Sequence, residues 1–306
     1  MAARHPRRDL HPSGVAGRRG TAGLVTAGLV TVGLLVGACG APQADDGASG
    51  TGTSAATAME TSAPPAGTTG TTVPATTTTA APPPRVALFG DSTALMSAFG
   101  LAGWLLDTGR GVPVDGRVDL GCSILRGGLR RDHIGIGPNN PVCDDWPTSW
   151  GEMLRAHRPD LAVVQTGPWD ILDHQFAGES VWRAPGDPTF DAALAAEMDA
   201  VLDLLSGEGA HVVWLTLPPQ RTGVGAGPGG DTAPATDPAR ADRYNAVLRQ
   251  VAAARPDDVT VLPYAEWLVD SGLDETLRPD GIHVAFDTSR TAADLWLGDQ
   301  IVSAAP

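Results

Sequence analysis

Val86-Ala87-Leu88-Phe89-Gly90-Asp91-Ser92 is the stretch that decides the fold of this 306-residue chain. Its first four residues form a continuous apolar run, which is typical of a strand buried on both faces of a parallel sheet. The serine that follows is therefore expected at the carboxyl edge of the sheet and at the start of a helix. In doubly wound folds this edge binds ligands. Ser92 is a candidate nucleophile, although a serine in such a place is more often a helix N-cap.

Apolar runs and helical patterns alternate along the rest of the chain. We expect strands over residues 85–89, 112–120, 161–166, 212–217 and 259–262, and helices over residues 94–106, 150–157, 190–205, 242–254 and 288–302. Such alternation gives βαβ units and a parallel sheet. The sequence predicts an α/β fold, a flavodoxin-like three-layer α/β/α domain with a central parallel sheet, over residues 85–306.

Two segments are expected to be loops, residues 121–146 and residues 220–238. The second contains a formal GxGxxG match at residues 225–230. We reject it as a dinucleotide site, because Pro228 lies inside it, the preceding strand ends several residues earlier and no helix opens on its last glycine.

A second motif, Asp280-Gly281-Ile282-His283, lies near the C-terminus. A serine hydroxyl is a weak nucleophile near neutral pH and needs a base within hydrogen-bond reach, which in turn needs an orienting acceptor. Asp280 can accept from one imidazole nitrogen of His283 while the other nitrogen faces Ser92. Each signal alone is weak, because a lone histidine is more often structural or solvated. The joint pattern predicts a Ser92-His283-Asp280 triad.

The composition excludes several classes of function. The chain has 21 arginines and no lysine, which excludes a Walker-type phosphate loop, a Schiff-base lysine and a lysine general base. Its net charge is −14, so a nucleic acid partner is not expected, since phosphates need a basic footprint. We expect no cofactor and no metal. Asp170, Asp173 and His174 lie close together but match no specific ligand spacing.

The N-terminal region is typical of an exported protein. Residues 1–38 combine several arginines with a short, glycine-containing apolar stretch and end in Val-Gly-Ala before Cys39. This resembles a bacterial lipoprotein signal peptide, with Cys39 as the lipidated residue. An ordinary signal peptide and an uncleaved anchor are the alternatives. Residues 39–84, rich in Thr, Ala and Pro, are expected to be a disordered tether. We therefore expect a protein lipid-anchored to the outer face of the bacterial cytoplasmic membrane.

Cys122 and Cys143 are the two cysteines that remain. In an exported protein, an even number of cysteines other than the lipidated one favours a disulfide bond. A metal site from two cysteines alone is not expected, because no histidine lies at ligand spacing beside them.

The domain resembles the SGNH (GDSL-type) hydrolases over residues 85–306. Four segments in the right order carry the resemblance: Phe89-Gly90-Asp91-Ser92-Thr93, Asp119-Leu120-Gly121-Cys122, Gln165-Thr166-Gly167-Pro168-Trp169-Asp170 and Asp280-Gly281-Ile282-His283. The resemblance implies that Ser92 is the nucleophile and that the backbone N–H groups of Ser92 and Gly121 form the oxyanion hole.

Trp169 departs from the family pattern, which usually has an asparagine oxyanion donor at this place. Loss of one such donor can cost roughly 100- to 1,000-fold in rate. Trp169 is either a third donor or a wall of the pocket that packs or stacks on sugar. A Gly-x-Trp-Asp segment is similar to SGNH domains fused to membrane acyltransferases of bacterial cell-envelope O-acylation systems. Trp146, Trp150 and Trp182 flank the expected pocket, where most tryptophans belong to the core but one could form a carbohydrate platform.

The resemblance implies a serine esterase or acyl-transfer enzyme that works through an acyl-Ser92 intermediate. The expected partner is an acyl ester, in particular an O-acylated cell-envelope glycan. Transfer to an alcohol acceptor instead of water is open, and so is the oligomeric state. A catalytically decayed glycan-binding lipoprotein is the main alternative. A purely structural envelope protein is a further one, but it leaves the Ser/Asp/His pattern unexplained.

Overall fold

The computed structural model describes residues 81–132, 135–222 and 234–306. Its centre is a six-stranded parallel sheet in which β1 lies next to β6, followed by β8 and β9, with β2 and β3 on the other edge of β1. The strands are β1 (Arg85–Gly90), β2 (Val112–Pro113), β3 (Arg117–Val118), β6 (Leu161–Gln165), β8 (His211–Leu215) and β9 (Val259–Leu262). This order is the flavodoxin-like one, so the predicted fold class is confirmed.

Alternate residues of each strand face opposite sides of the sheet and build two separate cores. In β6, for example, Leu161 and Val163 belong to one core and Ala162 and Val164 to the other, and all four are fully buried. Burial on both faces explains why these strands read as continuous apolar runs in the sequence.

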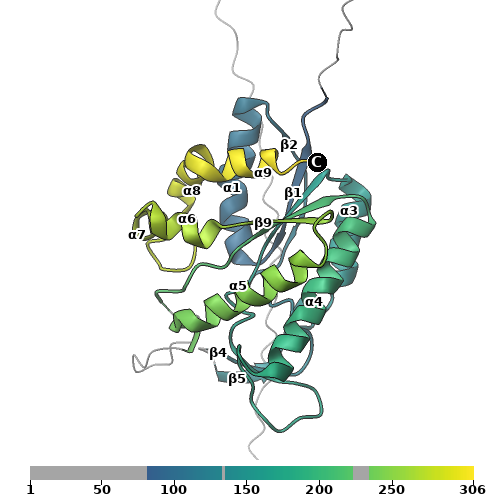
Figure 1. The fold of residues 1–306 in the computed structure, drawn as a ribbon, viewed down its shortest axis with the longest axis vertical. Coiled ribbons are helices and arrows are strands. Elements are labelled where there is room, and N and C mark those ends of the chain that lie inside the picture. The colour runs from purple at the N-terminus through teal and green to yellow at the C-terminus, as the bar shows by residue number, and fades with distance from the viewer. Residues whose placement is uncertain (1–80, 133–134, 223–233) are drawn as a thin grey trace, which may run out of the picture. The chain divides into compact units, whose positions relative to one another are not determined.

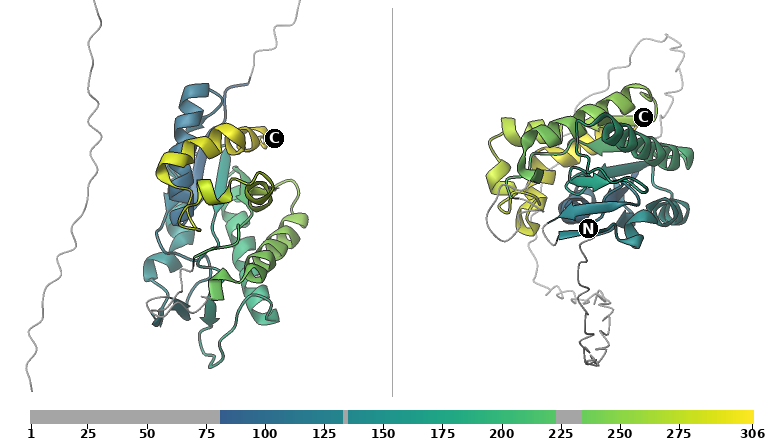
Figure 2. Two further views of the ribbon diagram at one scale, coloured as in Figure 1. Left: turned by 90° about the vertical axis from the view of Figure 1, so that its left-hand side faces the viewer. Right: turned by 90° about the horizontal axis from the view of Figure 1, so that it is seen from below.

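Helices cover both faces of the sheet (Figure 1), and views from two further sides show the same layers (Figure 2). One core holds α1 (Ser92–Thr108), α6 (Tyr264–Asp270), α7 (Asp274–Leu277), α8 (Phe286–Ala292), η2 (Ala293–Leu297) and α9 (Gly298–Ser303). The other holds α3 (Trp146–His157), α4 (Pro188–Gly207) and α5 (Pro238–Ala253), which follows the short η1 (Pro234–Thr236). The three-layer arrangement expected from the sequence is therefore present.

Several helices begin earlier than their apolar periodicity predicts. Asp187 and Asp237 cap α4 and α5 by accepting from the N–H groups of the first turn, and each is followed by a proline. Proline is favoured there because its missing N–H has no helical partner to lose. The expected strand over residues 112–120 is in fact two short pieces, since Pro113 can donate no hydrogen bond and is confined to an edge strand. The expected helix over residues 288–302 contains the π-helical turn η2.

The expectation that residues 121–146 form only a loop is wrong. This segment contains β4 (Leu129–Asp132), β5 (Gly135–Pro138) and α2 (Pro141–Asp144). β4 pairs in antiparallel register with β5 and with β7 (Asp173–Gln175), which gives a small second sheet. These strands are short and β5 is mostly exposed, so their sequences lack the apolar alternation that would indicate a strand.

The expected signal peptide, Cys39 and most of the tether fall outside the described residues, as does the glycine-rich motif at residues 225–230. Within the described ranges, no helix has both the length and the apolar character that a membrane crossing requires.

Candidate active site

Ser92, His283 and Asp280 form a continuous hydrogen-bonded chain. The distance from Ser92 Oγ to His283 Nε2 is 2.8 Å, and His283 Nδ1 lies 2.7 Å from Asp280 Oδ2. The structure thus brings together two segments that are 191 residues apart in the sequence. This is the arrangement in which an imidazole can accept a serine proton while a carboxylate fixes its orientation.

Ser92 is held by the sharp turn between β1 and α1. A Cβ atom on Gly90 would lie 2.0 Å from the carbonyl oxygen of Gln165, so only glycine allows β1 to approach β6 this closely. Asp91 is fully buried and caps α1, accepting from the N–H of Thr93 at 2.8 Å and from its hydroxyl at 2.6 Å. The N-cap is therefore Asp91 and not Ser92, which leaves the Ser92 hydroxyl for His283. Ser92 is the first residue of α1, where backbone N–H groups have no partner inside the helix.

His283 is held by a tight turn built on Asp280. Asp280 Oδ1 accepts from the backbone N–H groups of Ile282 at 2.8 Å and of His283 at 2.7 Å, while Oδ2 faces the imidazole. Burial alone would raise the pKa of Asp280, but the hydrogen bonds from the His283 ring and from these N–H groups outweigh it and lower the pKa. The carboxylate therefore stays ionised and can stabilise an imidazolium.

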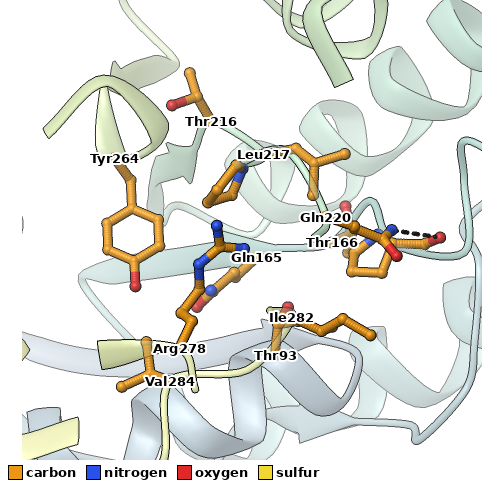
Figure 3. A pocket seen from close by; sticks show the side chains of 12 residues that line it. Thr93, Gln165, Thr166, Thr216, Leu217, Gln220, Tyr264, Arg278, Ile282 and Val284 are labelled. Carbon is orange, nitrogen blue, oxygen red and sulfur yellow. Dashed lines mark hydrogen bonds between the residues drawn. The ribbon is translucent and has the colours of Figure 1, made fainter. Parts of the chain in front are cut away.

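Arg278 anchors this turn from below, a role that the sequence did not indicate. Its side chain is 3% exposed and donates to the carbonyl oxygen of Pro219 at 3.0 Å and to Asp274 at 2.6 Å. Figure 3 shows it beside a cavity with Tyr264 on one side and Gln165 on the other. The cavity holds only about 10 Å³, which is too small for a substrate, so this polar region supports the loop and does not bind substrate.

Gly121 lies in a loop that is fastened to the nucleophile turn. The N–H of Asp119 donates to the carbonyl oxygen of Gly90 at 2.9 Å. Gly121 has φ of +74°, in the left-handed region that favours glycine, and its carbonyl oxygen accepts from Arg130 Nη1 at 3.1 Å. The predicted oxyanion glycine thus lies in a loop tied directly to the end of β1.

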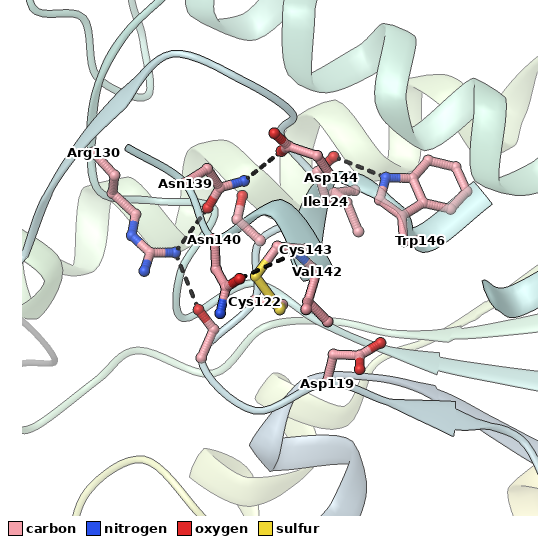
Figure 4. The surroundings of a disulfide bond; sticks show 12 residues. Asp119, Cys122, Ile124, Arg130, Asn139, Asn140, Val142, Cys143, Asp144 and Trp146 are labelled. Carbon is pink, nitrogen blue, oxygen red and sulfur yellow. Dashed lines mark hydrogen bonds between the residues drawn. A yellow bond between two sulfur atoms is a disulfide. The ribbon is translucent and has the colours of Figure 1, made fainter. Parts of the chain in front are cut away.

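The predicted disulfide between Cys122 and Cys143 is present, with the two Cα atoms 5.1 Å apart. It joins the Gly121 loop to α2, and Figure 4 shows Asn139 and Asp144 in the same cluster. Asp144 Oδ1 accepts from the N–H of Gly127 at 2.8 Å and from Asn139 Nδ2 at 2.9 Å. The chain-entropy model gives about 3 kcal/mol for a loop of this length.

Asp170 holds the same loop from its other side. It is fully buried, and its Oδ1 accepts from the Ser123 hydroxyl at 2.6 Å and from the N–H groups of Ile124 at 2.8 Å and Leu125 at 3.2 Å. Burial raises the pKa of Asp170 although these hydrogen bonds oppose it. Asp170 is therefore a brace for the Gly121 loop.

Trp169 lies over Gly121. A Cβ atom built on Gly121 would be 3.7 Å from Cζ2 of the Trp169 ring. The guanidinium of Arg130 stacks on that ring, 4.5 Å from its centroid, and the indole is half-buried against the core. The ring and Arg130 together form a wall beside the loop.

The other singled-out residues lie away from the triad. Trp146 and Trp150 are 3% and 2% exposed and pack in the core, as expected for most of these tryptophans, so neither of the two forms a carbohydrate platform. Trp182 is half-buried, with the Arg131 guanidinium 4.4 Å from its ring centroid. Asp173 pairs with Arg131 and Arg240. In the part of the chain that the structure describes, no three His, Cys, Asp or Glu side chains cluster as a metal site would require.

Comparison with known proteins gives a family but no close relative. No curated protein sequence matches the chain. A lipase/acylhydrolase from Enterococcus faecalis is similar in structure at 16% identity and a TM-score of 0.46, covering 72% of this chain and 94% of that one. The catalytic domain of a peptidoglycan O-acetyltransferase from Streptococcus pneumoniae is similar at 14% identity and a TM-score of 0.39, covering 73% of this chain and 93% of that one. These likenesses are too distant to bear on substrate.

The family model "SGNH domain (fused to AT3 domains)" matches residues 61–289, about three quarters of the chain. The match covers the nucleophile turn, the Gly121 loop, the Trp169 segment and the Asp280-to-His283 turn. The chain therefore belongs to the family of SGNH domains that occur fused to AT3 domains, and is an SGNH-type ester hydrolase or O-acyltransferase.

Proposed function

We propose that the protein is a serine esterase or acyltransferase that works through an acyl-Ser92 intermediate on O-acylated glycans of the cell envelope. The observation that carries the proposal is the unbroken chain from Ser92 Oγ to His283 Nε2, at 2.8 Å, and from His283 Nδ1 to Asp280 Oδ2, at 2.7 Å. A serine that only capped a helix would not need a histidine and a carboxylate aligned behind it.

The proposed reaction follows from this alignment. His283 Nε2 accepts the Ser92 proton as Oγ attacks the ester carbonyl carbon, and Asp280 stabilises the imidazolium that forms. The N–H groups of Ser92 and Gly121 bind the oxyanion. His283 then returns the proton to the leaving alcohol, which departs as the acyl-Ser92 ester forms. A water or a second alcohol, deprotonated by His283, attacks that ester and restores the free serine.

The proposal that the substrate is an envelope glycan rests on two features outside the triad. One is the family, whose members occur fused to AT3 domains, together with the Gly-x-Trp-Asp segment, which resembles SGNH domains of envelope O-acylation systems. The other is the N-terminal sequence, in which residues 1–38 would be a lipoprotein signal peptide, Cys39 the lipid attachment site and residues 39–84 a tether. The domain over residues 85–306 would then act at the outer face of the cytoplasmic membrane. Metabolic labelling with a fatty acid, lost in Cys39→Ala, tests that anchor.

The direct test of the chemistry uses the purified protein. We expect turnover of p-nitrophenyl acetate and covalent labelling by a fluorophosphonate, with both lost in Ser92→Ala. Labelling that persists unchanged in Ser92→Ala would exclude Ser92 as the nucleophile. Activity should also be lost on acidification, because a protonated His283 cannot accept the Ser92 proton.

A catalytically decayed glycan binder is the second candidate, favoured only by the tryptophan in place of an oxyanion asparagine. It predicts no labelling of the wild type and the same glycan affinity in Ser92→Ala. Hydrolysis and transfer are separated by product analysis with and without an acceptor sugar.

A further inference from the structure

An open groove of about 480 Å³ runs alongside Ser92 and His283. Its walls come from three segments of the chain: the first turns of α1, the residue before Gly121, and the turn from His283 into α8. Apart from the triad residues and Pro279, the side chains that line it are apolar: Leu95, Met96, Leu120, Val284, Ala285 and Phe286.

Two of these side chains face solvent to an unusual degree. Leu120 is 66% exposed and Phe286 is 67% exposed. Phe286 is supported from behind by Phe99, whose ring meets it edge-on with the centroids 5.1 Å apart. Large apolar side chains gathered on a strongly acidic chain mark a surface that binds something apolar. The groove begins at the nucleophile, so the apolar group that it binds must lie next to the scissile bond.

We propose that this groove binds the hydrocarbon chain of the acyl group, and that the enzyme acts on acyl chains longer than acetyl. The proposal rests on the proposed function, since it assumes an acyl-Ser92 intermediate. The volume lies within the range of about 300 to 1,000 Å³ that is typical of small-molecule sites.

The acyl part of the ester suits this groove better than the alcohol part. A glycan alcohol carries hydroxyl groups, and burying them without hydrogen-bond partners is unfavourable. Leu95, Met96 and Phe286 offer no such partners, and the polar atoms at the groove belong to the triad. An acyl chain leaves the carbonyl carbon that bonds to Ser92 Oγ, so it can enter the groove from its first methylene onward.

Chain-length dependence is the first test. Each methylene that leaves water contributes about 0.8 kcal/mol, or about fourfold in kcat/KM. For p-nitrophenyl acetate, butyrate, hexanoate and octanoate, normalised to their uncatalysed hydrolysis, kcat/KM should rise by about 15-fold from acetate to butyrate and continue to rise before levelling off. A constant or falling series, with acetate still turned over in a Ser92-dependent manner, would overturn the groove assignment and leave the proposed function intact.

An alcohol series distinguishes the two sides of the ester. Methyl, butyl and hexyl acetates keep the acyl group constant and lengthen the leaving alcohol. The proposal expects little change along this series. A rise with alcohol length, combined with no dependence on acyl length, would assign the groove to the leaving group and refute the proposal.

Variants tie the preference to the groove. Met96→Trp places a larger side chain in it and Leu120→Ser removes an exposed wall, so each should lower the ratio of octanoate to acetate kcat/KM by about tenfold or more. Leu106→Ser is the matched control, because Leu106 is an equally exposed leucine of α1, 70% exposed, that does not line the groove. An equal change of the ratio in Leu106→Ser and Leu120→Ser would contradict the proposal.

Discussion

The candidate site has two arms, the nucleophile arm around Ser92 and the histidine arm around His283. Each contains one aspartate, and the two aspartates have opposite roles. Asp91, beside Ser92, is fully buried, and burial raises its pKa to about 7 although Thr93 donates two hydrogen bonds to it. Asp280, before His283, has a side chain that is 52% exposed, and its hydrogen bonds lower its pKa despite partial burial. The first shapes the nucleophile turn, and the second supplies the charge that a protonated His283 needs.

The largest effect on activity is expected at the exposed arm. Asp280→Asn should keep the turn but remove the charge and change the tautomer that His283 prefers, so kcat/KM for an activated ester should fall by about 10³- to 10⁴-fold. The thermal midpoint should change little, since the side chain is half-exposed. Steady-state kinetics and thermal unfolding measure the two. A loss no greater than that of Asp91→Asn would remove the distinction between the aspartates.

The disulfide bond restrains the Gly121 loop and neither of the two arms. Breaking it in Cys122→Ser/Cys143→Ser should lower the free energy of unfolding by about 3 kcal/mol. For a domain of this size that corresponds to a fall of roughly 6 to 12 °C in the thermal midpoint. Scanning calorimetry with and without a reductant gives the measurement. An unchanged midpoint in the double variant would mean that Asp170 and Asp144 hold the loop by themselves.

Substitution of Trp169 tests whether this side chain, which packs on the Gly121 loop, takes part in the chemistry. The ring of Trp169 packs on Gly121 and is covered by Arg130, so we expect it to form a wall of the site and not to donate to the oxyanion. Trp169→Phe should then lower kcat by less than about tenfold. Trp182→Phe is the matched control, since Trp182 also stacks with an arginine but belongs to no part of the site. A loss of 100-fold or more confined to Trp169→Phe would identify the indole N–H as an oxyanion donor instead.

The parts that the sequence predicts well are those in which local pattern and burial agree. The runs at β1, β6, β8 and β9 are predicted to within two residues, because β1, β6 and β8 are buried on both faces and β9 is at least half-buried along its length. Ser92, Asp280 and His283 are found because each follows or precedes a recognisable element within a few residues. The distances between the three side chains follow only from the folded structure.

The parts that the sequence misses depend on contacts between distant segments. Arg130 lies on β4, a strand with no apolar alternation, and its partners Gly121, 9 residues away, and Trp169 belong to different segments, so no local motif indicates its role. Arg278 is buried and donates hydrogen bonds to Pro219 and Asp274, and no local sequence pattern indicates a buried arginine. Both are positioning residues, whose identity depends on packing that the motifs do not encode.

Asp91 gives the smallest expected effect on activity and the sharpest contrast with Asp280 in the pH dependence of stability. Its folded-state pKa of about 7 lies above the ordinary value of 3.8, so the folded protein binds this proton more tightly than the unfolded chain does. The stability that this group contributes is therefore full below about pH 4 and declines as the pH rises to about 7. Asp91→Asn keeps an oxygen that can accept from Thr93 but does not titrate.

Across that interval the stability of Asp91→Asn should rise relative to that of the wild type by up to about 4 kcal/mol, which corresponds to roughly 8 to 16 °C in the thermal midpoint. Thermal unfolding of both proteins from about pH 4 to about pH 8 measures the difference. Asp280→Asn should show no pH-dependent difference from the wild type over the same interval, because the pKa of Asp280 lies below its ordinary value of 3.8 and its stabilising contribution is lost only on acidification below about pH 4. Parallel pH profiles for the two variants would mean that burial does not set the charge state of Asp91, and the contrast between the two arms would fail.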